Sequence, residues 1–186
     1  MAVTVTVETG LVVTGANSYV SLANFQTYCD DRGMDYSAYT DDQQEAALIR
    51  SAQYLNDLRW KGVKTGRDNP MAWPRYGTEV GGSMWNQLEF PASTWVGVLD
   101  RDGFYVGTSE VPAEVVKAQC EAAFLILTGS TLEPSLDRGG AVKREKVDVI
   151  ETEYFPGAPG ETTFKPIINR LMGLLKSGST IETVRA

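Results

Sequence analysis

The chain has 186 residues, of which 42% are hydrophobic, enough for one well-packed core but not for two independent ones. It carries 17 Lys and Arg residues against 24 Asp and Glu residues, a formal net charge of -7, so binding to nucleic acid would require basic residues concentrated in one place. Histidine is absent, which removes the commonest general base and metal ligand at neutral pH. We therefore expect a single domain over residues 1–186 that is not an enzyme and uses no cofactor or metal.

The two cysteines, Cys29 and Cys120, have no partners at the spacing of a metal site, and both fall in stretches with helical apolar periodicity. We expect them to be buried free thiols in a reducing compartment. The longest apolar stretch, residues 122–127, is far shorter than the ~20 residues of a membrane span, and the N-terminus lacks the pattern of a signal peptide. No membrane partner is therefore expected.

Residues 1–15 are predicted to form an extended N-terminal arm. Val3, Val5 and Val7 alternate with polar residues, which is the period of a β-strand. Because no hairpin partner lies nearby in the sequence, this strand must pair elsewhere, and a neighbouring subunit could supply the partner.

Two helices are predicted next. Ser21 is a suitable N-cap for a helix that ends near Gly33. Thr40 begins a capping-box pattern for a second helix over residues 41–59, which carries one apolar stripe.

Residues 60–107 contain all four tryptophans and are rich in glycine and proline, with no sustained helical or strand period. Irregular segments of this length in a compact domain are usually functional, because loops that only connect elements are short. We expect a long irregular loop here, with a third helix from Pro112 to about Gly129 that is the most buried of the set.

The C-terminal part is predicted to contain a charged strand, a helix and a tail. Residues 141–154 interleave charges of both signs with valines, which favours either an edge strand completed by another copy or a solvated hairpin. Pro166 begins a fourth helix that includes Leu175, and residues 177–186 form a flexible tail. The fold is thus predicted to be mainly α: a four-helix bundle-like core within residues 16–176, a long irregular Trp-rich loop and one or two extended β segments.

Basic and aromatic residues are interleaved from Arg59 to Tyr76, where five basic residues against Asp68 give a local charge of +4. Bases of single-stranded nucleic acid stack on aromatic rings, contributing about 1–3 kcal/mol each, while phosphates meet Lys and Arg. Alternatively, the tryptophans are hydrophobic anchors that tie the loop to the helices while the charges face water. The candidate contact residues are Trp60, Lys61, Lys64, Arg67, Trp73 and Arg75.

Several short motifs follow one another along the chain in an order that resembles known phage proteins. They are GANSYVS (15–21), ALIRSAQYL (47–55), WKG (60–62), AWPR (72–75), VP (111–112) and GAVKREKV (140–147). The ordered set resembles tailed-phage proteins labelled DnaT-like single-stranded DNA-binding. The plan of helices, long loop, charged strand and C-terminal helix is also similar to head-tail connector (adaptor) proteins of phages.

Our main hypothesis follows the second resemblance, which implies a structural virion protein. Copies would form a ring, usually dodecameric, that joins the portal to the tail and lets packaged DNA pass through its lumen without specific binding. The implied partners are other copies of the chain, the portal protein and a downstream tail or tail-completion protein. The implied location is the virion neck, after synthesis in the cytoplasm of the bacterial host.

The same resemblance assigns candidate contact residues. The inter-subunit strand would use Val142, Lys143, Arg144, Glu145, Lys146, Val147, Asp148 and Val149. Portal docking would use Leu171, Leu175, Ile181, Val184 and Arg185, and the Trp-rich loop would face the tail. The alternative hypothesis follows the DnaT-like label, which implies single-stranded DNA binding in phage replication through that loop.

Overall fold

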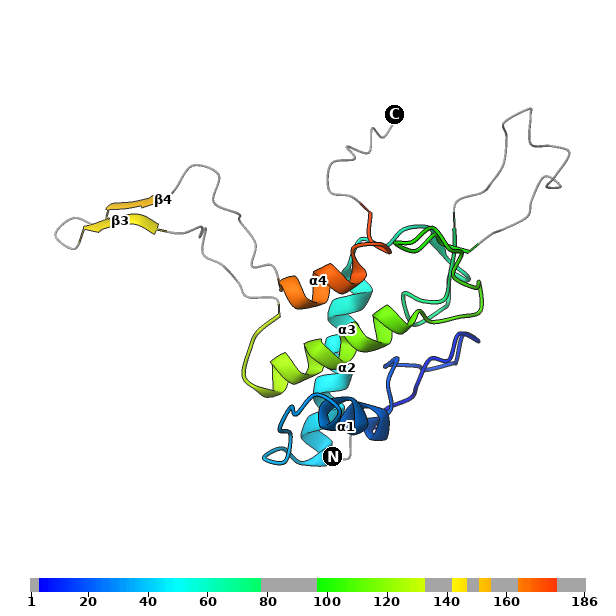
Figure 1. The fold of residues 1–186 in the computed structure, drawn as a ribbon, viewed down its shortest axis with the longest axis horizontal. Helices are drawn as coiled ribbons and strands as arrows, with labels where there is room; N and C mark the ends of the chain where they lie inside the picture. Colours follow the sequence, from blue (N-terminus) through cyan, green and yellow to red (C-terminus); the bar gives the residue numbers. More distant parts are fainter. Residues whose placement is uncertain (1–3, 78–96, 133–141, 147–150, 155–163, 177–186) are drawn as a thin grey trace, which may run out of the picture.

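The structure is a computed structural model that describes residues 4–77, 97–132, 142–146, 151–154 and 164–176. Its helices are α1 (Leu22–Asp30), α2 (Asp41–Asp57), α3 (Ala113–Leu127) and α4 (Lys165–Leu171). Two antiparallel strand pairs join β1 (Val63–Lys64) to β2 (Arg75–Tyr76), and β3 (Val142–Lys146) to β4 (Glu151–Tyr154). The prediction of a mainly α fold with a four-helix core is confirmed (Figure 1). Among the described helices, none has both the length and the apolar character needed to cross a membrane.

The starts of α1 and α2 are fixed by local capping, as the sequence predicts. The Ser21 hydroxyl accepts a hydrogen bond from the Asn24 amide at 3.2 Å. Thr40 and Gln43 form a reciprocal capping box, in which each side chain satisfies the other residue's backbone amide. Because a cap acts through residues two or three positions away, such starts can be predicted from sequence alone.

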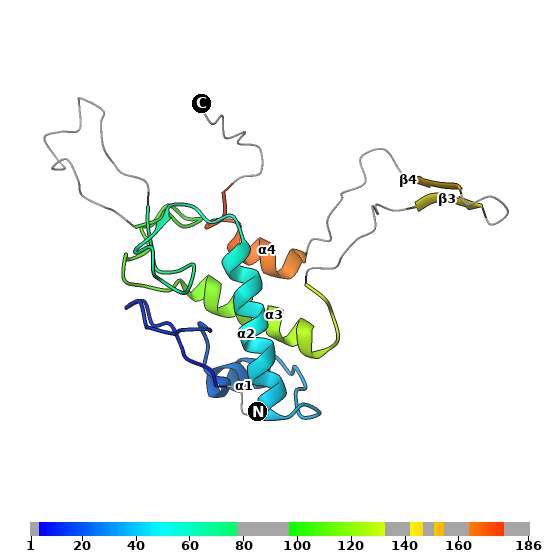
Figure 2. The same ribbon diagram turned by 180° about the vertical axis from the view of Figure 1, so that it is seen from behind.

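Helix α3 lies at the centre of the core and contacts each of the other three helices. Both ribbon views show it crossing α2, with α4 on one side of that crossing and α1 near the other end of α2 (Figures 1 and 2). Pro112 occupies the N-cap position of α3, so the helix begins one residue later than predicted. Cys29 and Cys120 are both buried and free, which confirms the expectation for the thiols.

Two predicted helix ends are wrong, and both errors have one cause. Helix α2 ends at Asp57 and α4 at Leu171, so Leu174 and Leu175 lie beyond the helix in which they were placed. The chain after each helix pairs with the other: the Lys61 amide donates to Leu174 O at 2.9 Å, and the Lys176 amide donates to Arg59 O at 2.8 Å. Extended backbone is needed for these bonds, which join segments more than a hundred residues apart.

The N-terminal segment packs on its own chain, contrary to the suggestion that a neighbouring subunit pairs with it. Val7 forms a parallel bridge with Ser18. The Glu8 carboxylate is buried and accepts hydrogen bonds from three backbone amides, those of Gly10, Val12 and Val13, at 2.8–3.0 Å. These bonds hold residues 8–13 in a closed turn against the core.

A buried glutamine on α3 joins three parts of the core. Gln119 Nε2 donates to the Ser18 hydroxyl at 2.7 Å and to Leu48 O on α2 at 2.9 Å, while its Oε1 accepts from the Tyr19 amide at 2.8 Å. The residue is fully buried, and the Tyr19 amide would otherwise lack a hydrogen bond, whereas Leu48 O also accepts from the Ser51 hydroxyl and the Ser18 hydroxyl also bonds Val20. Gln119 therefore fixes the N-terminal segment and α2 onto α3.

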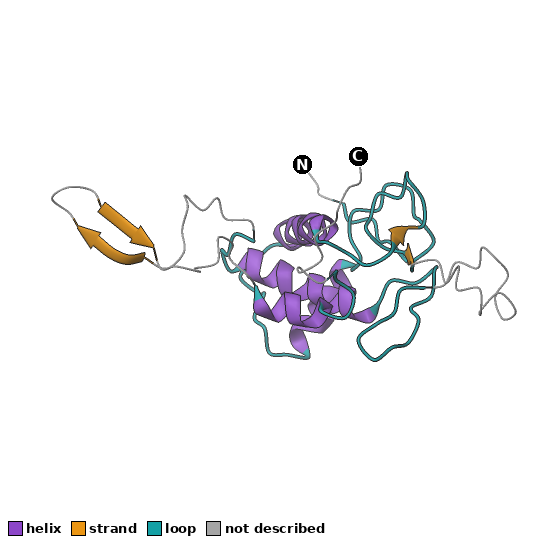
Figure 3. Ribbon diagram, turned by 90° about the horizontal axis from the view of Figure 1, so that it is seen from above, coloured by secondary structure: helices purple, strands orange, loops and turns teal. Residues whose placement is uncertain are grey.

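The described residues of the segment 141–154 form two paired strands, not one. Strand β3 pairs with β4 in a hairpin, with Arg144 opposite Glu153 and Lys146 opposite Glu151. The hairpin alternative is therefore the correct one. Among the described elements, β3 and β4 contact only each other, and Figure 3 shows them apart from the helices. Of the proposed inter-subunit residues, Val142 to Lys146 lie in β3, and Val147, Asp148 and Val149 lie outside the described residues.

Candidate nucleic-acid interface

Two of the tryptophans proposed to stack on DNA are core residues. Trp60 and Trp73 are 3% and 0% exposed, and their rings meet edge to face with centroids 5.7 Å apart. Trp60 Nε1 also donates to Leu55 O at the end of α2. The anchor alternative is therefore confirmed for this pair, and neither ring is available to a base.

Arg75 is likewise an internal residue. Its guanidinium donates to Lys61 O at 2.7 Å, to Gly62 O at 2.8 Å and to Ala72 O at 3.0 Å. Burial lowers the pKa of this guanidinium, yet arginine remains charged under all ordinary conditions. Arg75 thus clamps both sides of the loop between α2 and β2, and we withdraw it as a DNA contact.

Tyr19 secures the same loop from the N-terminal side. Its hydroxyl donates to Asn56 Oδ1 at 3.0 Å and accepts from the Trp73 amide at 3.1 Å, while Asn56 Oδ1 also accepts from the Ala72 amide at 2.8 Å. Burial raises the pKa of Tyr19 far above its usual value, so the hydroxyl remains a proton donor. The loop is consequently a rigid support for the residues that it exposes.

Other basic residues accompany this loop on three segments that meet in space, 59–77, 97–107 and 172–176, which we call together the basic end. These segments carry seven Lys and Arg residues against Asp68, Asp100 and Asp102, a net charge of +4 on a chain of net charge -7. Arg59, Lys64, Arg67, Arg101 and Lys176 are exposed, whereas Lys61 is half-buried. The required local concentration of positive charge therefore exists, although Arg101 and Lys176 were not in the predicted set.

Gly173 is the point where the three segments meet. The Lys61 ammonium donates to Gly173 O. A Cβ placed on Gly173 would lie 2.5 Å from Arg101 N, so the turn carrying Arg101 packs directly on this backbone. Together with the pairing of Arg59 and Lys176, these contacts bring cations from distant parts of the sequence onto one end of the molecule.

A tight turn at the basic end exposes two aromatic side chains that the sequence analysis did not select. Asp100 Oδ1 accepts from the amides of Asp102 and Phe104 at 2.9 and 2.8 Å, and Leu99 bridges Tyr105 across the turn. Phe104 and Tyr105 are 72% and 57% exposed. Such exposure of two adjacent rings is unusual for a soluble surface unless the rings have a partner. The signal in the sequence was the turn motif DRDG followed directly by two aromatics.

Of the residues proposed to dock on a portal, two lie in the described part of the chain, and neither is exposed. Leu171 is fully buried, and Leu175 is half-buried and bridged to Trp60. Ile181, Val184 and Arg185 lie outside the described residues.

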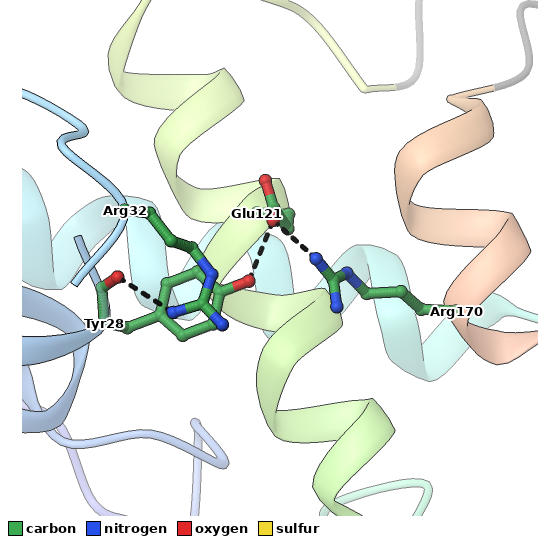
Figure 4. Close-up of polar contacts among 4 residues, drawn as sticks. All are labelled: Tyr28, Arg32, Glu121 and Arg170. Carbon is green, nitrogen blue, oxygen red and sulfur yellow. Dashed lines mark hydrogen bonds and ion pairs between the residues drawn. The ribbon is translucent and has the colours of Figure 1, made fainter.

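A second cluster of polar side chains ties α1, α3 and α4 together (Figure 4). Glu121 Oε1 accepts from the Tyr28 hydroxyl at 2.8 Å and from Arg170 Nη2 at 2.9 Å. The Arg32 guanidinium lies 3.6 Å from the centroid of the Tyr28 ring. Burial, followed by the bond to Glu121, raises the pKa of Tyr28 to about 12. Since its charges are satisfied within the cluster, we assign it to packing of the helices.

The fold and this surface define a small, mainly helical protein with one cationic, aromatic end on an acidic chain, a combination typical of domains that bind single-stranded nucleic acid. The model of the family described as "Putative DnaT-like ssDNA binding protein" matches residues 3–94 and 83–186. The chain therefore belongs to this DnaT-like family. Neither the curated proteins nor the solved structures contain a match to the chain.

Membership of this family overturns our main functional hypothesis. The family description names single-stranded DNA binding, which agrees with the alternative and not with a structural head-to-tail adaptor. The predictions of a ring, of portal and tail partners, and of DNA passing without specific binding were therefore wrong. The resemblance to the DnaT-like label, by contrast, is confirmed.

Proposed function

We propose that this protein binds single-stranded DNA through the basic end, with phosphates at its exposed cations and bases stacked on Phe104 and Tyr105. The observation that carries the proposal is the pair of exposed rings on a rigid turn whose backbone packs beside Gly173, where basic side chains from three segments gather. Membership of the DnaT-like family supports the same function. Binding of this kind involves no catalytic step, and we place it in the cytoplasm of the bacterial host.

Stacking favours a single strand over a duplex. In a duplex both faces of each base are already covered, whereas an unpaired base offers a free face to an aromatic ring. The Asp100 hydrogen bonds fix the turn before DNA arrives, so little conformational entropy is lost on binding. The aromatic pair should therefore supply the preference for single strands, and the cations the general affinity.

Negative charge near the turn also limits the path that the DNA strand can take. A hollow of about 370 Å³ lies between the turn and α4, and three acidic residues, Asp100, Asp102 and Glu114, line it together with Arg101 and Arg170. Acids outnumber bases there, so phosphates are disfavoured. The strand is expected to run on the other side of the turn, along Arg59, Lys64 and Arg67.

The proposal is tested by changing Phe104 without changing its apolar character. Phe104→Leu removes the flat ring but keeps a large aliphatic side chain, so it should weaken binding of a fluorescent oligothymidine about 5- to 150-fold, as expected for one lost stack. Phe104→Trp keeps a ring and should bind at least as tightly as the wild type. Fluorescence anisotropy with a duplex competitor measures both affinity and strand preference.

An exposed apolar residue outside the three segments of the basic end serves as the control. Leu11 is 76% exposed and lies on the N-terminal segment, so Leu11→Ala should leave the affinity unchanged. Equal affinities for the Phe104→Leu variant and the wild type would reject the stacking role of the turn, and tighter binding to duplex than to single strand would reject the function.

A further inference from the structure

A groove of about 490 Å³ lies where α2 and α3 diverge, beside the basic end but separate from it. One wall is formed by Arg50, Gln53, Tyr54 and Asp57 of α2, which recur at three- and four-residue spacing and therefore share one helix face. The other wall is formed by Ile126 and Leu132. The volume falls in the range of small-ligand sites, roughly 300–1,000 Å³.

The two walls differ in chemistry. Ile126 and Leu132 are apolar and pack at the edge of the core, and Tyr54 faces the groove with a half-buried ring. A flat, weakly polar ring system fits between such surfaces, because it covers apolar area on both faces. The apolar wall and the Tyr54 ring therefore suit the flat face of an aromatic ligand.

Polar groups at the rim of the groove determine which hydrogen-bonding groups the edge of that ligand must carry. Arg50, Gln53 and Asp57 are exposed, and among the described residues none of them has a hydrogen-bond or ion-pair partner in the structure. Asn56 also lines the groove, but its side-chain oxygen is already used by Tyr19 and Ala72. The groups available to a ligand are therefore the Arg50 cation, the Gln53 amide and the Asp57 carboxylate, together with the exposed Thr131 hydroxyl, which also lines the groove.

This set matches one base better than the others. Guanine presents two adjacent N–H donors, N1–H and the 2-amino group, which a carboxylate accepts side by side, and next to them the O6 acceptor, to which an amide N–H can donate. Adenine and cytosine place a ring-nitrogen acceptor beside their amino group, and thymine flanks its single N–H with two carbonyls, so each of them sets an acceptor against a carboxylate. Arg50 stands about 10 Å along the helix from Asp57, at a distance suited to the phosphate of the same nucleotide.

We propose that this groove binds a guanine base of single-stranded DNA, with Asp57 and Gln53 at its pairing edge, Tyr54 against its face and Arg50 at its phosphate. The inference rests on the proposed function, to which it adds base selectivity. Asp57 is the last residue of α2, and Arg59 begins the basic end two residues later, so one end of the groove lies within two residues of the expected path of the DNA.

The test compares an oligothymidine with the same oligonucleotide carrying one central guanine. The wild type should bind the guanine-containing strand about tenfold more tightly, the discrimination expected of a bidentate contact. Asp57→Asn should abolish that difference and leave the affinity for oligothymidine within about twofold. Because this change also removes a negative charge, Asp42→Asn at the other end of α2 is the matched control, and it should keep the tenfold preference.

The outcomes separate the two proposals. Tight binding of both oligonucleotides with equal affinity, or a preference that survives Asp57→Asn, overturns the guanine groove and leaves the proposed function standing. If no oligonucleotide binds, the proposed function fails, and the groove is tested alone by NMR with deoxyguanosine monophosphate against thymidine monophosphate. Shifts of the Gln53 and Arg50 resonances with the guanine nucleotide only would then support the groove, and their absence would overturn it.

Discussion

Replacing Arg75 tests whether this residue clamps the loop or serves DNA. Arg75→Ala removes the donors to Lys61 O, Gly62 O and Ala72 O. A hydrogen bond from a charged donor contributes about 1.5–3 kcal/mol. The carbonyls of Lys61 and Gly62 are only partly buried and can regain water, whereas the bond to Ala72 O is fully buried. We therefore expect a loss of about 2–4 kcal/mol in the free energy of unfolding, not the full sum.

In a chain of this size that loss corresponds to a fall in Tm of roughly 5–15 °C, measurable by circular dichroism during heating or by urea titration. Arg75→Lys should recover little, since one ammonium cannot satisfy three carbonyls. Arg67 is exposed, so Arg67→Ala should change stability by less than about 0.5 kcal/mol. An Arg75→Ala protein as stable as Arg67→Ala, but defective in DNA binding, would refute the clamp and restore Arg75 as a DNA contact.

Two further predictions concern the core. Gln119→Leu preserves much of the side-chain volume but leaves the buried Tyr19 amide without its partner and removes the bonds to Ser18 and Leu48, so the free energy of unfolding should fall by about 1–3 kcal/mol in urea titration; an unchanged transition midpoint would contradict the role of Gln119. Burial raises the pKa of the Cys29 and Cys120 thiols from 9.0 to about 11 and about 12, so both should resist a thiol reagent at pH 8 in the native state and react once the chain is unfolded. The unfolded chain releases these protons first, so their contribution to stability is complete below about pH 9 and is lost as the pH rises toward 11–12; native thiols that react at pH 8 would disprove their burial.

Features that depend on neighbouring residues in the chain were predicted well. The caps of α1 and α2 were correct because a side chain at the N-cap bonds to an amide only two or three residues away. The ends of α2 and α4 were predicted wrongly, because they are set by the pairing of residues 59–61 with residues 174–176. Neither segment contains a local sequence signal that indicates its distant partner. The same limit explains why β3 and β4 could be either a hairpin or a single strand on sequence alone.

The candidate site was placed in the correct segment but assigned partly to the wrong residues. Basic residues interleaved with tryptophans can be explained equally by DNA contacts or by anchoring, and the choice depends on which side chains face inward. Trp73 and Arg75 face inward, whereas Lys64 and Arg67 face water. Phe104 was overlooked because exposure follows from the tertiary fold. The family, in contrast, was evident from the order of short motifs, although that order did not decide between two functions.

The most direct test of single-stranded DNA binding is the salt dependence of oligothymidine affinity. If the three exposed cations along the expected path of the DNA, Arg59, Lys64 and Arg67, each displace a counterion, the logarithm of the association constant should fall against the logarithm of salt concentration with a slope of about −2. Replacing both Lys64 and Arg67 by glutamine should make that slope shallower by about 1.4 units. Arg32→Gln, just after the end of α1 and outside the basic end, should leave the slope unchanged. Absence of binding at low salt, or a slope that the paired substitution does not alter, would contradict the account.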